Sequence, residues 1–567
     1  MTTNYAEHFS TKQTPQSEPI PGSAQVPNSA GGFSFKLDDW NRLDRWLVLG
    51  SSEGSYYASE QKLTKENAEA VLRCIKADGL RVVRTIVDIS TSGRAPKNDP
   101  ALFALAMAMK LGDEKTKKMA GEVLPQVARI GTDLFHLASF CDKAFGGWGR
   151  GTRGAFAKWY TGKPLGKLAY QTVKYQSRDG WSHRDVLRLA HAAPETEAHA
   201  LLHAWAGRWN KPNEVVAAGL GKLVDGSAVP DGLALVAAFE EAKRATSTKE
   251  VVRLIEQHKL THEMVPTEFL KEAQVWAALL PHMKPWALVR NLARMTANGL
   301  LKPMAKEVAL ITTMLGDESV LRAERLHPIK VLTALLQYKA GHGNRGSLTW
   351  EPVGAIVDAL DAAFYKTFGC VEPANKRTLL ALDVSGSMSG WNIAGVEGLT
   401  PRVGSCAMAL VTAATEKQHA FVAFTSGARG EWKHGKGNSQ HYGYAAGITE
   451  LAISPKARLD HVCEATAKLP MGGTDCALPM LWAMDRKVEV DTFCVYTDSE
   501  TWHGDIHPAQ ALQQYRQKMG IPARLVVVGM VANEFSIADP NDAGMLDVVG
   551  FDTTTPELIS GFSAGRF

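Results

Sequence analysis

The spacing of apolar residues changes once along this chain, near Pro373, and this change limits the folds open to it. From about residue 37 to residue 367 apolar residues recur at helical spacing, as in DPALFALAMAMKL (99–111), where we expect Asp99 to cap a helix and Pro100 to begin it. Short breaks with Gly, Pro or Asn separate these segments. Many helices without a sheet predict a bundle or an α-solenoid, and the lack of a strict period favours a degenerate HEAT-like array.

After Pro373 short β-rich runs alternate with helical stretches. The runs are RTLLALDV (377–384), HAFVAFTS (419–426), VDTFCVYTD (490–498) and ARLVVVGM (523–530). This alternation predicts a parallel sheet with helices on both faces, in which ligands bind at the carboxyl ends of the strands. We therefore expect an α plus α/β multidomain protein with a flexible tail over residues 1–32, a helical domain over 33–370 and an α/β domain over 371–567.

Composition sets the class of protein. At 567 residues the chain is too long for one core. Its first 32 residues are polar, contain four prolines and lack a basic-then-apolar signal pattern, which favours a flexible tail. No run approaches the roughly 18 apolar residues of a membrane span. The seven cysteines are scattered and never spaced CxxC, which argues against a disulfide framework and a zinc site. A cytoplasmic protein is the simplest interpretation.

An acid and two hydroxyls follow the first β-rich run, in LLALDVSGSMSG (379–390). Asp383, Ser385 and Ser387 stand at alternate positions, so on extended chain their side chains project to one side. Neither serine has the flanking glycines of a nucleophile elbow. The stretch also lacks a GxxxxGK[ST] phosphate loop, the Gly and Glu of an EF-hand, and the second acid of a DxD phosphatase.

A hard divalent cation remains, and Mg²⁺ prefers oxygen ligands. MGGTD supplies Thr474 and VYTDSE supplies Asp498, both placed at expected strand ends. Five oxygen ligands from three loops leave one position open for a carboxylate or another oxygen. The set resembles the metal-ion-dependent adhesion site of von Willebrand factor A domains, which fills the same five positions. A tight turn would explain Ser and Gly after one strand, but not the matching residues elsewhere.

The net charge of +4 hides an asymmetry between the two parts. Residues 371–567 hold 16 Lys/Arg against 21 Asp/Glu, and residues 1–370 hold 47 against 38, so a polyanionic partner is expected on the N-terminal part. Residues 143–191 contain ten Lys/Arg, two Asp and eight aromatic residues. Cations track phosphates and aromatic planes stack on unpaired bases, so this stretch suits RNA; solvated helix faces above core aromatics are the alternative.

Spacing selects individual cations in this stretch. Lys167, Lys174 and Arg178 fall at i, i+7 and i+11, which predicts one helix face. The pattern of Arg184, Arg188 and His191 predicts a second face, although a His in this position equally suits a helix C-cap. Charge and spacing add Arg150 and Arg153 to the candidates. The expected RNA-binding residues are Arg150, Arg153, Lys167, Lys174, Arg178, Arg184, Arg188 and His191.

A second basic group follows in the helical part. Its members are Lys284, Arg290, Arg294, Arg322, Arg325, His327 and Lys330. If the helices curve into a ring, some of these side chains face inward. A solvated face is the other interpretation, and spacing alone does not separate the two.

Seven dispersed stretches resemble the Ro autoantigen family. They are NRLDRWLVLGSSEGSYY (41–57), TKENAEAVL (64–72), GWGRGTRGAFAKWY (147–160), KYQSRDGWSHRDVLRLAH (174–191), YKAGHGNRG (338–346), ALDVSGSM (381–388) and GGTDCALPM (472–480). The helical part resembles the TROVE domain of that family, and the resemblance runs from about residue 33 to the C-terminus. A bacterial Ro orthologue is the simplest interpretation.

This resemblance implies a ring of HEAT-like helices closed by a doubly wound von Willebrand A domain. An outer basic surface would bind a small noncoding Y RNA, with Lys174, Arg178 and His191 matching the family motif. A central hole would admit the single-stranded 3′ end of misfolded RNA. The implied role is non-enzymatic: noncoding-RNA quality control and stress-linked RNA processing. The implied partners are these RNAs and an exoribonuclease such as polynucleotide phosphorylase, and a chain that closes its own ring is expected to be a monomer.

Two other functions stay open at this point. A metal-dependent scaffold would coordinate a partner's carboxylate and bind an acidic protein on its basic helices. A metal-dependent hydrolase would need a His or Glu base beside the ligands, and only Glu500 is close to Asp498 in sequence. The stretch WNIAGVEGLTPR (391–402) is inserted beside the metal loop and would change what docks there.

Overall fold

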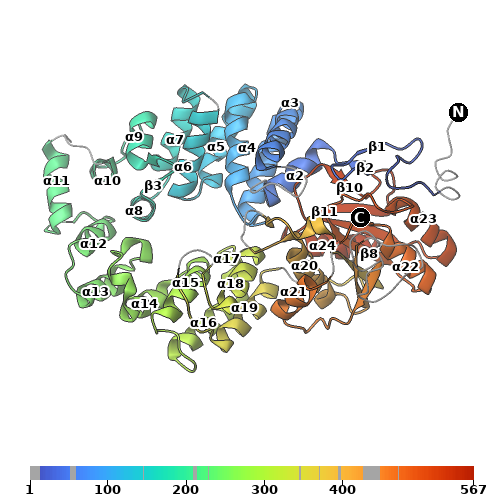
Figure 1. Ribbon diagram of the computed structural model, residues 1–567. Coiled ribbons are helices and arrows are strands. Elements are labelled where there is room, and N and C mark those ends of the chain that lie inside the picture. The colour runs from blue at the N-terminus through green and yellow to red at the C-terminus, as the bar shows by residue number, and fades with distance from the viewer. Residues whose placement is uncertain are drawn as a thin grey trace.

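The helical part of the protein forms two rows that together make a closed ring (Figure 1). The computed structural model describes residues 13–50, 59–144, 146–207, 214–227, 229–343, 347–368, 371–393, 398–425, 447–469 and 472–566. The helices run from α2 (Asp39–Leu49) to α19 (Gly354–Lys366), which confirms the helical pattern expected between residues 37 and 367.

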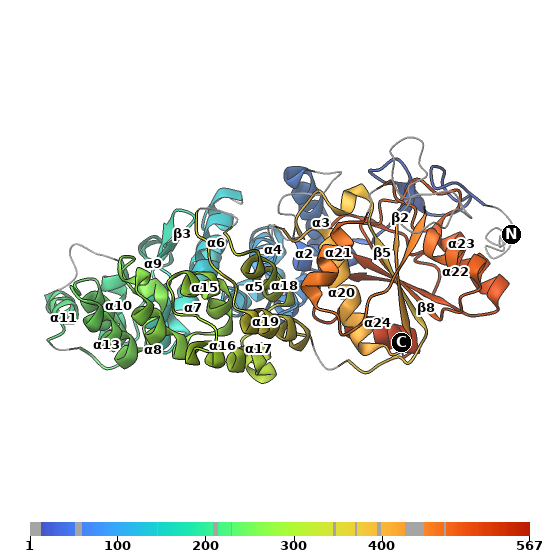
Figure 2. The same ribbon diagram turned by 60° about the horizontal axis from the view of Figure 1, so that its bottom comes forward.

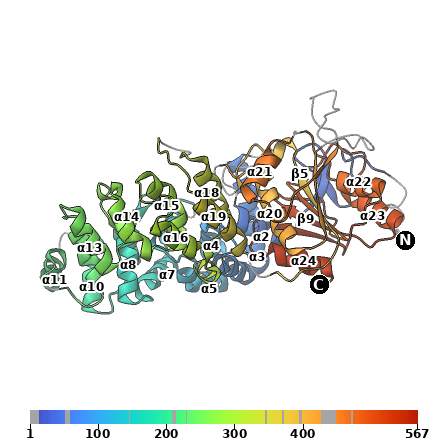
Figure 3. The same ribbon diagram turned by 90° about the horizontal axis from the view of Figure 1, so that it is seen from below.

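The first row runs away from the α/β domain and the second row returns to it, as the view from below also shows (Figure 3). The first row contains α3 (Glu60–Ser92), α4 (Asp99–Leu111), α5 (Glu114–Val127), α6 (Gly131–Ser139), α7 (Arg150–Thr161), α8 (Leu165–Lys174), α9 (His183–Ala190), α10 (Glu197–Gly207) and α11 (Glu214–Asp225). The second row contains α12 (Ala234–Ala242), α13 (Thr248–His258), α14 (Ala273–Leu279), α15 (Pro285–Ala297), α16 (Lys306–Gly316), α17 (Glu318–Ala323) and α18 (Pro328–Ala340). At the far end α8 and α11 pack against α12 and join the rows.

Local signals place the helix ends, with one correction. Asn98 is the N-cap of α4, so Asp99 lies in the first turn instead of capping the helix as expected. A carboxylate there still complements the helix dipole. Capping boxes open α9 at Ser182 and α13 at Ser247, where the third residue of each helix is an acid that accepts from the cap backbone.

The α/β domain is built on a six-stranded sheet with helices on both faces (Figure 2). Its strands are β5 (Thr378–Asp383), β6 (His419–Phe424), β7 (Ile448–Leu451), β8 (Thr492–Thr497), β9 (Arg524–Gly529) and β11 (Met545–Val549). The order is β11-β9-β8-β5-β6-β7, and only β7 is antiparallel to its neighbour. The four strands expected from the sequence are confirmed, and β7 and β11 are additional.

Alternate residues of strand β5 pack into two different core clusters, one on each face of the sheet. Leu380 and Leu382 of β5 lie in the core cluster that includes α20 (Pro401–Thr415), α21 (Leu459–Ala467) and α24 (Thr555–Ala564). Leu379 and Ala381 lie in the cluster with α22 (Leu478–Arg486) and α23 (Pro508–Met519). A strand buried on both faces reads as a continuous apolar run, which is how β5 reads in the sequence.

Residues 13–36 belong structurally to the α/β domain, which corrects the expected tail and the expected boundary at residue 33. β1 (Gln25–Pro27) and β2 (Phe33–Lys36) form a small sheet with β10 (Phe535–Ser536). The buried Gln16 donates from Nε2 to Asp475 Oδ1 at 2.7 Å and to the Ile506 carbonyl at 2.8 Å. Residues 1–12 lie outside the described residues. Composition failed here because polar side chains, satisfied by hydrogen bonds, hold the segment in place.

Arg94 joins the beginning of the first row, the end of the second row and the α/β domain. Its guanidinium donates from Nε and Nη2 to Asp552, at distances of 2.6 to 3.1 Å, and from Nη1 to Asp88 at 2.9 Å. Its carbonyl oxygen accepts a hydrogen bond of 2.9 Å from Nε2 of His327, which caps α18. Burial lowers the pKa of His327 to about 3, so its imidazole is neutral and donates from Nε2.

Further ion pairs fix both ends of the ring to the α/β domain. In α2, Arg45 is 1% exposed and pairs with Asp547, next to a pair between Arg42 and Glu534 at 2.7 Å. In the last helices, Lys339 pairs with the buried Asp460 at 2.9 Å. The expected ring of helices closed by an α/β domain is therefore confirmed.

Composition argued against disulfides and against membrane spans, and the described residues bear on both. The six cysteines found there are free and buried, so none forms a disulfide. No helix in the described ranges is both long and apolar enough to cross a membrane.

We expect Arg94→Gln to loosen the ring where its two ends meet. The substitution leaves the 2%-exposed Asp552 without its cation, and breaking a buried pair in this way costs about 3–5 kcal/mol. Hydrogen exchange should accelerate at the start of α18 and the maximum dimension in small-angle X-ray scattering should increase. Arg73→Gln, which breaks an exposed pair with Asp39, is the matched control and should change neither. Equal effects of both variants would contradict this role of Arg94.

Candidate nucleic-acid interface and metal site

Four of the five expected metal ligands follow adjacent parallel strands. Asp383 ends β5 and is followed by Ser385 and Ser387, and Asp498 comes directly after β8, which pairs with β5. Parallel neighbours end at one edge of the sheet, so these side chains meet there. Thr474 does not follow a strand as expected; it lies in the loop between α21 and α22.

The loops that carry these side chains contact one another directly. The carbonyl oxygen of Thr474 accepts hydrogen bonds from the backbone N–H groups of Trp502 at 3.1 Å and His503 at 3.0 Å. The hydroxyls of Ser385 and Ser387 lie 3.1 Å apart. All five candidate ligands are at most 5% exposed, so the loops hold them buried at this edge of the sheet.

Two buried carboxylates share this site. Burial raises the pKa of Asp383 to about 7, and the charge of Asp498 raises it further. Burial also raises the pKa of Asp498, against the hydrogen bond from Ser387. In the described part of the chain neither carboxylate has an ion-pair partner. A cation is the group that such a pair lacks.

The donor set fits Mg²⁺. Two carboxylates and three hydroxyls are hard oxygen ligands, and Mg²⁺ keeps several waters when it binds few carboxylates. Within the ranges that the structure describes, no group of three or more His, Cys, Asp or Glu side chains is placed to hold a metal. A transition-metal site of the usual His and Cys type is therefore not found among these residues.

The stretch 391–402 beside the metal loop ends in a buried arginine. Arg402 is 3% exposed and donates from Nη1 to Ser389 Oγ at 3.5 Å and from Nη2 to the carbonyl of Leu469. It thereby ties the loop after Ser387 to the loop before Thr474. Burial lowers the pKa of Arg402 to about 10, and the nearby Asp383 opposes this shift. Residues 394–397 of the stretch lie outside the described residues.

Six of the expected RNA-binding residues lie on one basic face, the α7–α9 basic face. α7 packs against α9, and a hairpin of β3 (Ser177–Arg178) and β4 (Trp181–Ser182) precedes α9. All six side chains are exposed. They are Arg150 and Arg153 in the first turn of α7, Arg178 on the hairpin, Arg184 and Arg188 one turn apart on α9, and His191 at its end.

Two of the spacing arguments are corrected. Arg178 is not on a helix face with Lys167 and Lys174, because α8 ends at Lys174 and Arg178 is paired in the hairpin. His191 is the C-cap of α9 with φ of 52°, which is the capping alternative left open by the sequence. Trp181 of the hairpin is partly buried against the core and stacks on Trp148 with the ring planes 7° apart.

Lys174 faces the opposite row of helices. Its Nζ lies 3.6 Å from a carboxylate oxygen of Glu263, in the helical turn η2 (His262–Met264) of the second row. Its side chain is only 11% exposed and lies near the rings of Tyr170 and Tyr175. Lys167, seven residues earlier on α8, is exposed. The structure therefore separates Lys174 from the exposed α7–α9 basic face.

Further cations lie where the two rows face each other, around Trp286. The Nζ of Lys330 lies 3.9 Å from the centre of the Trp286 ring, and the guanidinium of Arg290 lies 5.3 Å from it. Trp286 is 39% exposed although it is a large apolar residue. We call these residues and their neighbours the inner basic surface: Arg129, Trp286, Arg290, Arg294, Arg325 and Lys330.

Electrostatics links the inner basic surface across the rows. Burial lowers the pKa of Lys330 to about 8, and the positive charges of Arg290 and Arg129 lower it further, while Asp133 and Asp99 oppose the shift. Arg129 follows α5 in the first row, whereas Lys330 is on α18 in the second. Burial also lowers the pKa of His262, to which Lys174, Arg290 and Arg294 add.

The sequence left open whether the second basic group faces the inside of the ring or is a solvated face, and the structure answers this for part of the group. Arg290, Arg294, Arg325 and Lys330 form no ion pair with the residues described here, although Asp133 and Asp99 lie close enough to act on Lys330 at longer range. Lys284 and Arg322 pair with acids, and His327 is buried at the ring junction. Trp286 and Arg129 were not among the candidates; the spacing of Trp286 four residues before Arg290 was the available signal.

Comparison with known proteins agrees with this combination of ring, basic surfaces and sheet-edge site. Residues 26–340 match the family model of the TROVE domain, and residues 377–563 match that of the Ro60 vWA domain. The chain belongs to the Ro60 family of RNA-binding proteins.

Individual relatives cover nearly the whole chain. "RNA-binding protein RO60" of Deinococcus radiodurans is 41% identical over 555 residues, covering 97% of each chain. The Caenorhabditis elegans protein of the same name is 34% identical over 618 residues, covering 98% of this chain and 92% of the relative. The crystal structure of Deinococcus radiodurans RO (RSR) protein matches with a TM-score of 0.66 at 39% identity, covering 93% of this chain and 100% of that one.

We expect MgCl₂ to stabilise the α/β domain, and more so at pH 8 than at pH 6. The folded-state pKa of Asp383 is raised from 3.8 to about 7, so without metal the stability of the protonated acid is fully present below about pH 4 and is lost as the pH rises toward 7. A cation that replaces this proton stabilises most where the acid is ionised. Differential scanning calorimetry with MgCl₂ or EDTA measures the shift.

Asp383→Asn should abolish the Mg²⁺-dependent shift in melting temperature, whereas Asp505→Asn, at an exposed carboxylate on the loop after Asp498, should retain it. An equal shift in both variants would show that Mg²⁺ acts elsewhere.

Proposed function

We propose that this protein binds a small structured noncoding RNA, of the Y RNA type, on its α7–α9 basic face and takes the single-stranded 3′ end of a misfolded RNA between its two rows of helices. We further propose that this binding serves noncoding-RNA quality control and stress-linked RNA processing in the cytoplasm. Both parts refine the RNA binding that defines its family.

The observation that carries this proposal is the exposed Trp286 between the cations of the inner basic surface. Arg290 and Lys330 approach its ring from the same row, and the charge of Arg129 reaches Lys330 from the opposite row. Repulsion among such cations is relieved by a polyanion. An exposed indole beside them offers a stacking surface for a base, and every base has a face that stacks.

This arrangement suits a single strand better than a duplex. Stacking on Trp286 needs an unpaired base, and the cations on both sides contact phosphates without reading sequence. The lowered pKa of Lys330, about 8, leaves it largely protonated at neutral pH, and a bound phosphate would raise that pKa again. We therefore propose binding that depends on single-strandedness and on salt, with little base preference.

The α7–α9 basic face suits a folded RNA instead. Its arginines are exposed, and Arg184 and Arg188 on α9 form no ion pair with residues in the described ranges. Double-stranded RNA is recognised through phosphates and shape, which a row of exposed guanidiniums contacts well. Lys174 pairs with Glu263 of the second row, so it belongs to the space between the rows and not to this face.

The sheet-edge site supports a separate role in recruiting a protein. We propose that Mg²⁺ held by Asp383, Ser385, Ser387, Thr474 and Asp498 keeps an open position for an acidic side chain of a partner, such as an exoribonuclease. Trp502, beside the Thr474 loop, is 37% exposed and offers an apolar anchor next to that position. In this proposal the protein presents RNA without cleaving it and acts as a monomer.

We expect the variant Arg178→Ala/Arg188→Ala to weaken binding of a structured RNA while keeping binding that depends on a 3′ tail, because both arginines lie on the exposed α7–α9 basic face. Fluorescence titrations across salt would compare one hairpin with and without a single-stranded tail. Six neutralised phosphates give a slope of about −4 to −5 in log K against log salt. Arg486→Ala/Lys518→Ala removes two exposed cations from the α/β domain and is the control. Absence of wild-type binding to either RNA would contradict the proposed function.

We expect Trp286→Ala to weaken tail-dependent binding about tenfold, because one base stack contributes about 1–3 kcal/mol. Trp286→Phe keeps an aromatic face and should retain most of the affinity. Trp502→Ala removes an equally exposed indole from the α/β domain and should have no effect. The same titrations measure all three, and an unchanged tail contribution in Trp286→Ala would place the strand elsewhere.

A further inference from the structure

We propose that a pocket beside the α7–α9 basic face binds one unpaired nucleobase, together with its phosphate, from the RNA bound there. The pocket lies between the β3–β4 hairpin and helices α9, α10, α11 and α12, at the end of the ring far from the α/β domain (Figure 1). This inference rests on the proposed function. It adds a site that recognises an unpaired base in an otherwise double-stranded RNA.

The pocket has the size and lining of a small-ligand site. It encloses about 520 Å³, within the range of about 300–1,000 Å³ common for such sites. Apolar and aromatic side chains of α10, α11 and α12 form one part of its wall, and polar side chains of the hairpin and α9 form the rest. The lining residues used below are Ser182, Arg184, Asp185, Trp205, Phe239 and Lys243.

The aromatic wall is held in place before any ligand binds. The indole N–H of Trp205 donates to Glu240 Oε1 at 3.0 Å, and Nζ of Lys243 donates to the same oxygen at 2.5 Å. Phe239 meets Trp205 edge to face, with ring centres 6.2 Å apart and planes at 85°. A fixed aromatic surface loses little entropy when a planar base stacks on it.

The charge at the pocket favours an anionic group next to that base. Both acids in the wall are already engaged: Glu240 with Trp205 and Lys243, and Asp185 with the hydroxyl and backbone N–H of Ser182. Arg184 lines the pocket and is exposed, and its side chain forms no ion pair or hydrogen bond with another residue in the described part of the chain. Its guanidinium is therefore available to a phosphate.

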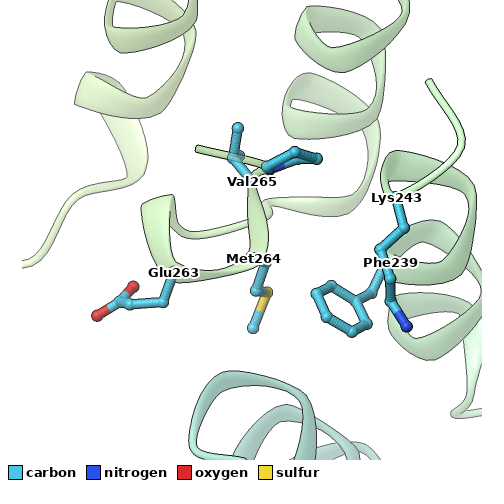
Figure 4. A pocket seen from close by; sticks show the side chains of 6 residues that line it. Phe239, Lys243, Glu263, Met264 and Val265 are labelled. Carbon is cyan, nitrogen blue, oxygen red and sulfur yellow. The ribbon is translucent and has the colours of Figure 1, made fainter. Parts of the chain in front are cut away.

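A second pocket adjoins the first. It encloses about 400 Å³ and shares Phe239 and Lys243 with the first pocket. Figure 4 shows Phe239 projecting from α12 toward Met264, with Glu263 next to it. Glu263 in turn pairs with Lys174. The second pocket thus lies next to the first and beside the Lys174–Glu263 pair, which links the two rows.

A nucleobase fits this combination better than an apolar side chain or a lipid tail. The aromatic wall provides stacking, the hairpin and α9 provide polar edges, and Arg184 provides the phosphate contact. RNA on the neighbouring face brings an unpaired base to the pocket at high local concentration. A free nucleotide offers the same chemistry, so the test includes both sources.

The test uses the full-length protein and three RNA hairpins: an uninterrupted stem, the same stem with one bulged adenosine, and the same stem with an abasic residue in the bulge. Titrations would be run for wild type, Trp205→Leu and Trp40→Leu. Trp40 on α2 is, like Trp205, a partly buried tryptophan and serves as the matched control. We expect wild type to prefer the bulged adenosine to the abasic bulge about tenfold, the size of one base stack. Trp205→Leu should lose that preference and keep the affinity for the uninterrupted stem.

A readout on the wild-type protein alone keeps the test valid if Trp205→Leu does not fold. A bulged 2-aminopurine should lose fluorescence on binding, because stacking quenches it, whereas the abasic stem with 2-aminopurine inside the duplex should change little. Adenosine monophosphate that displaced only the bulge-specific component would support a pocket that also accepts a free nucleotide. Adenosine monophosphate without effect would support a base delivered by RNA.

Two results would overturn the inference, and they are distinguishable. If all three hairpins bind equally and with a steep salt dependence, the pocket does not read a base, while the proposed RNA binding stands. If no hairpin binds, both the inference and the proposed function fail. If Trp205→Leu weakens all three hairpins equally while Trp40→Leu does not, Trp205 is needed for the fold, and the wild-type 2-aminopurine signal alone decides whether the pocket binds a base.

Discussion

The closure of the helical chain at Arg94 is the constraint on which the rest of the structure depends. Its side chain reaches Asp552 of the α/β domain and its carbonyl oxygen accepts from His327 at the start of α18, so one residue joins the first row, the last row and the second domain. Closure brings Arg129 of the first row close enough to Lys330 of the second for their charges to repel. Burial is the main reason that the pKa of Lys330 is lowered, and the charges of Arg290 and Arg129 lower it further. RNA that neutralises these charges would bind only the closed ring and so stabilise it.

The two domains are also continuous through the N-terminal segment. Gln16 contacts Asp475, next to Thr474, and its Oε1 accepts a hydrogen bond from Thr501, three residues after Asp498. The segment then runs through β2 into α2, where the ring begins. Two of the three loops that carry the candidate metal ligands are thus braced by the chain that leads into the helices. The sheet-edge site and the ring are parts of one framework.

Much of this arrangement was predictable from sequence, because periodicity and short motifs report local structure. The helices, four strands and the grouping of Asp383, Ser385, Ser387 and Asp498 followed from patterns within a few residues of one another. What failed depended on distant partners. Gln16 is held in place by residues more than 450 positions away. Arg178 lies on a hairpin, although its spacing from Lys174 had predicted that both lie on one helix. Lys174 itself pairs with Glu263 on the other row. For the inner basic surface the sequence predicted only a group of cations. It did not predict that these cations face one another, because that depends on how the two rows pack.

The central claim is that a single strand lies between the rows against Trp286, and site-specific photocrosslinking tests it most directly. An RNA hairpin with a single-stranded 3′ tail would carry one 4-thiouridine in that tail, and the crosslinked peptide would be identified by mass spectrometry. The account predicts crosslinks to peptides of α15 or α18, around Trp286 and Lys330, which lie 3.9 Å apart from ring centre to Nζ. Crosslinks confined to the α7–α9 basic face or to the sheet edge of the α/β domain would contradict it.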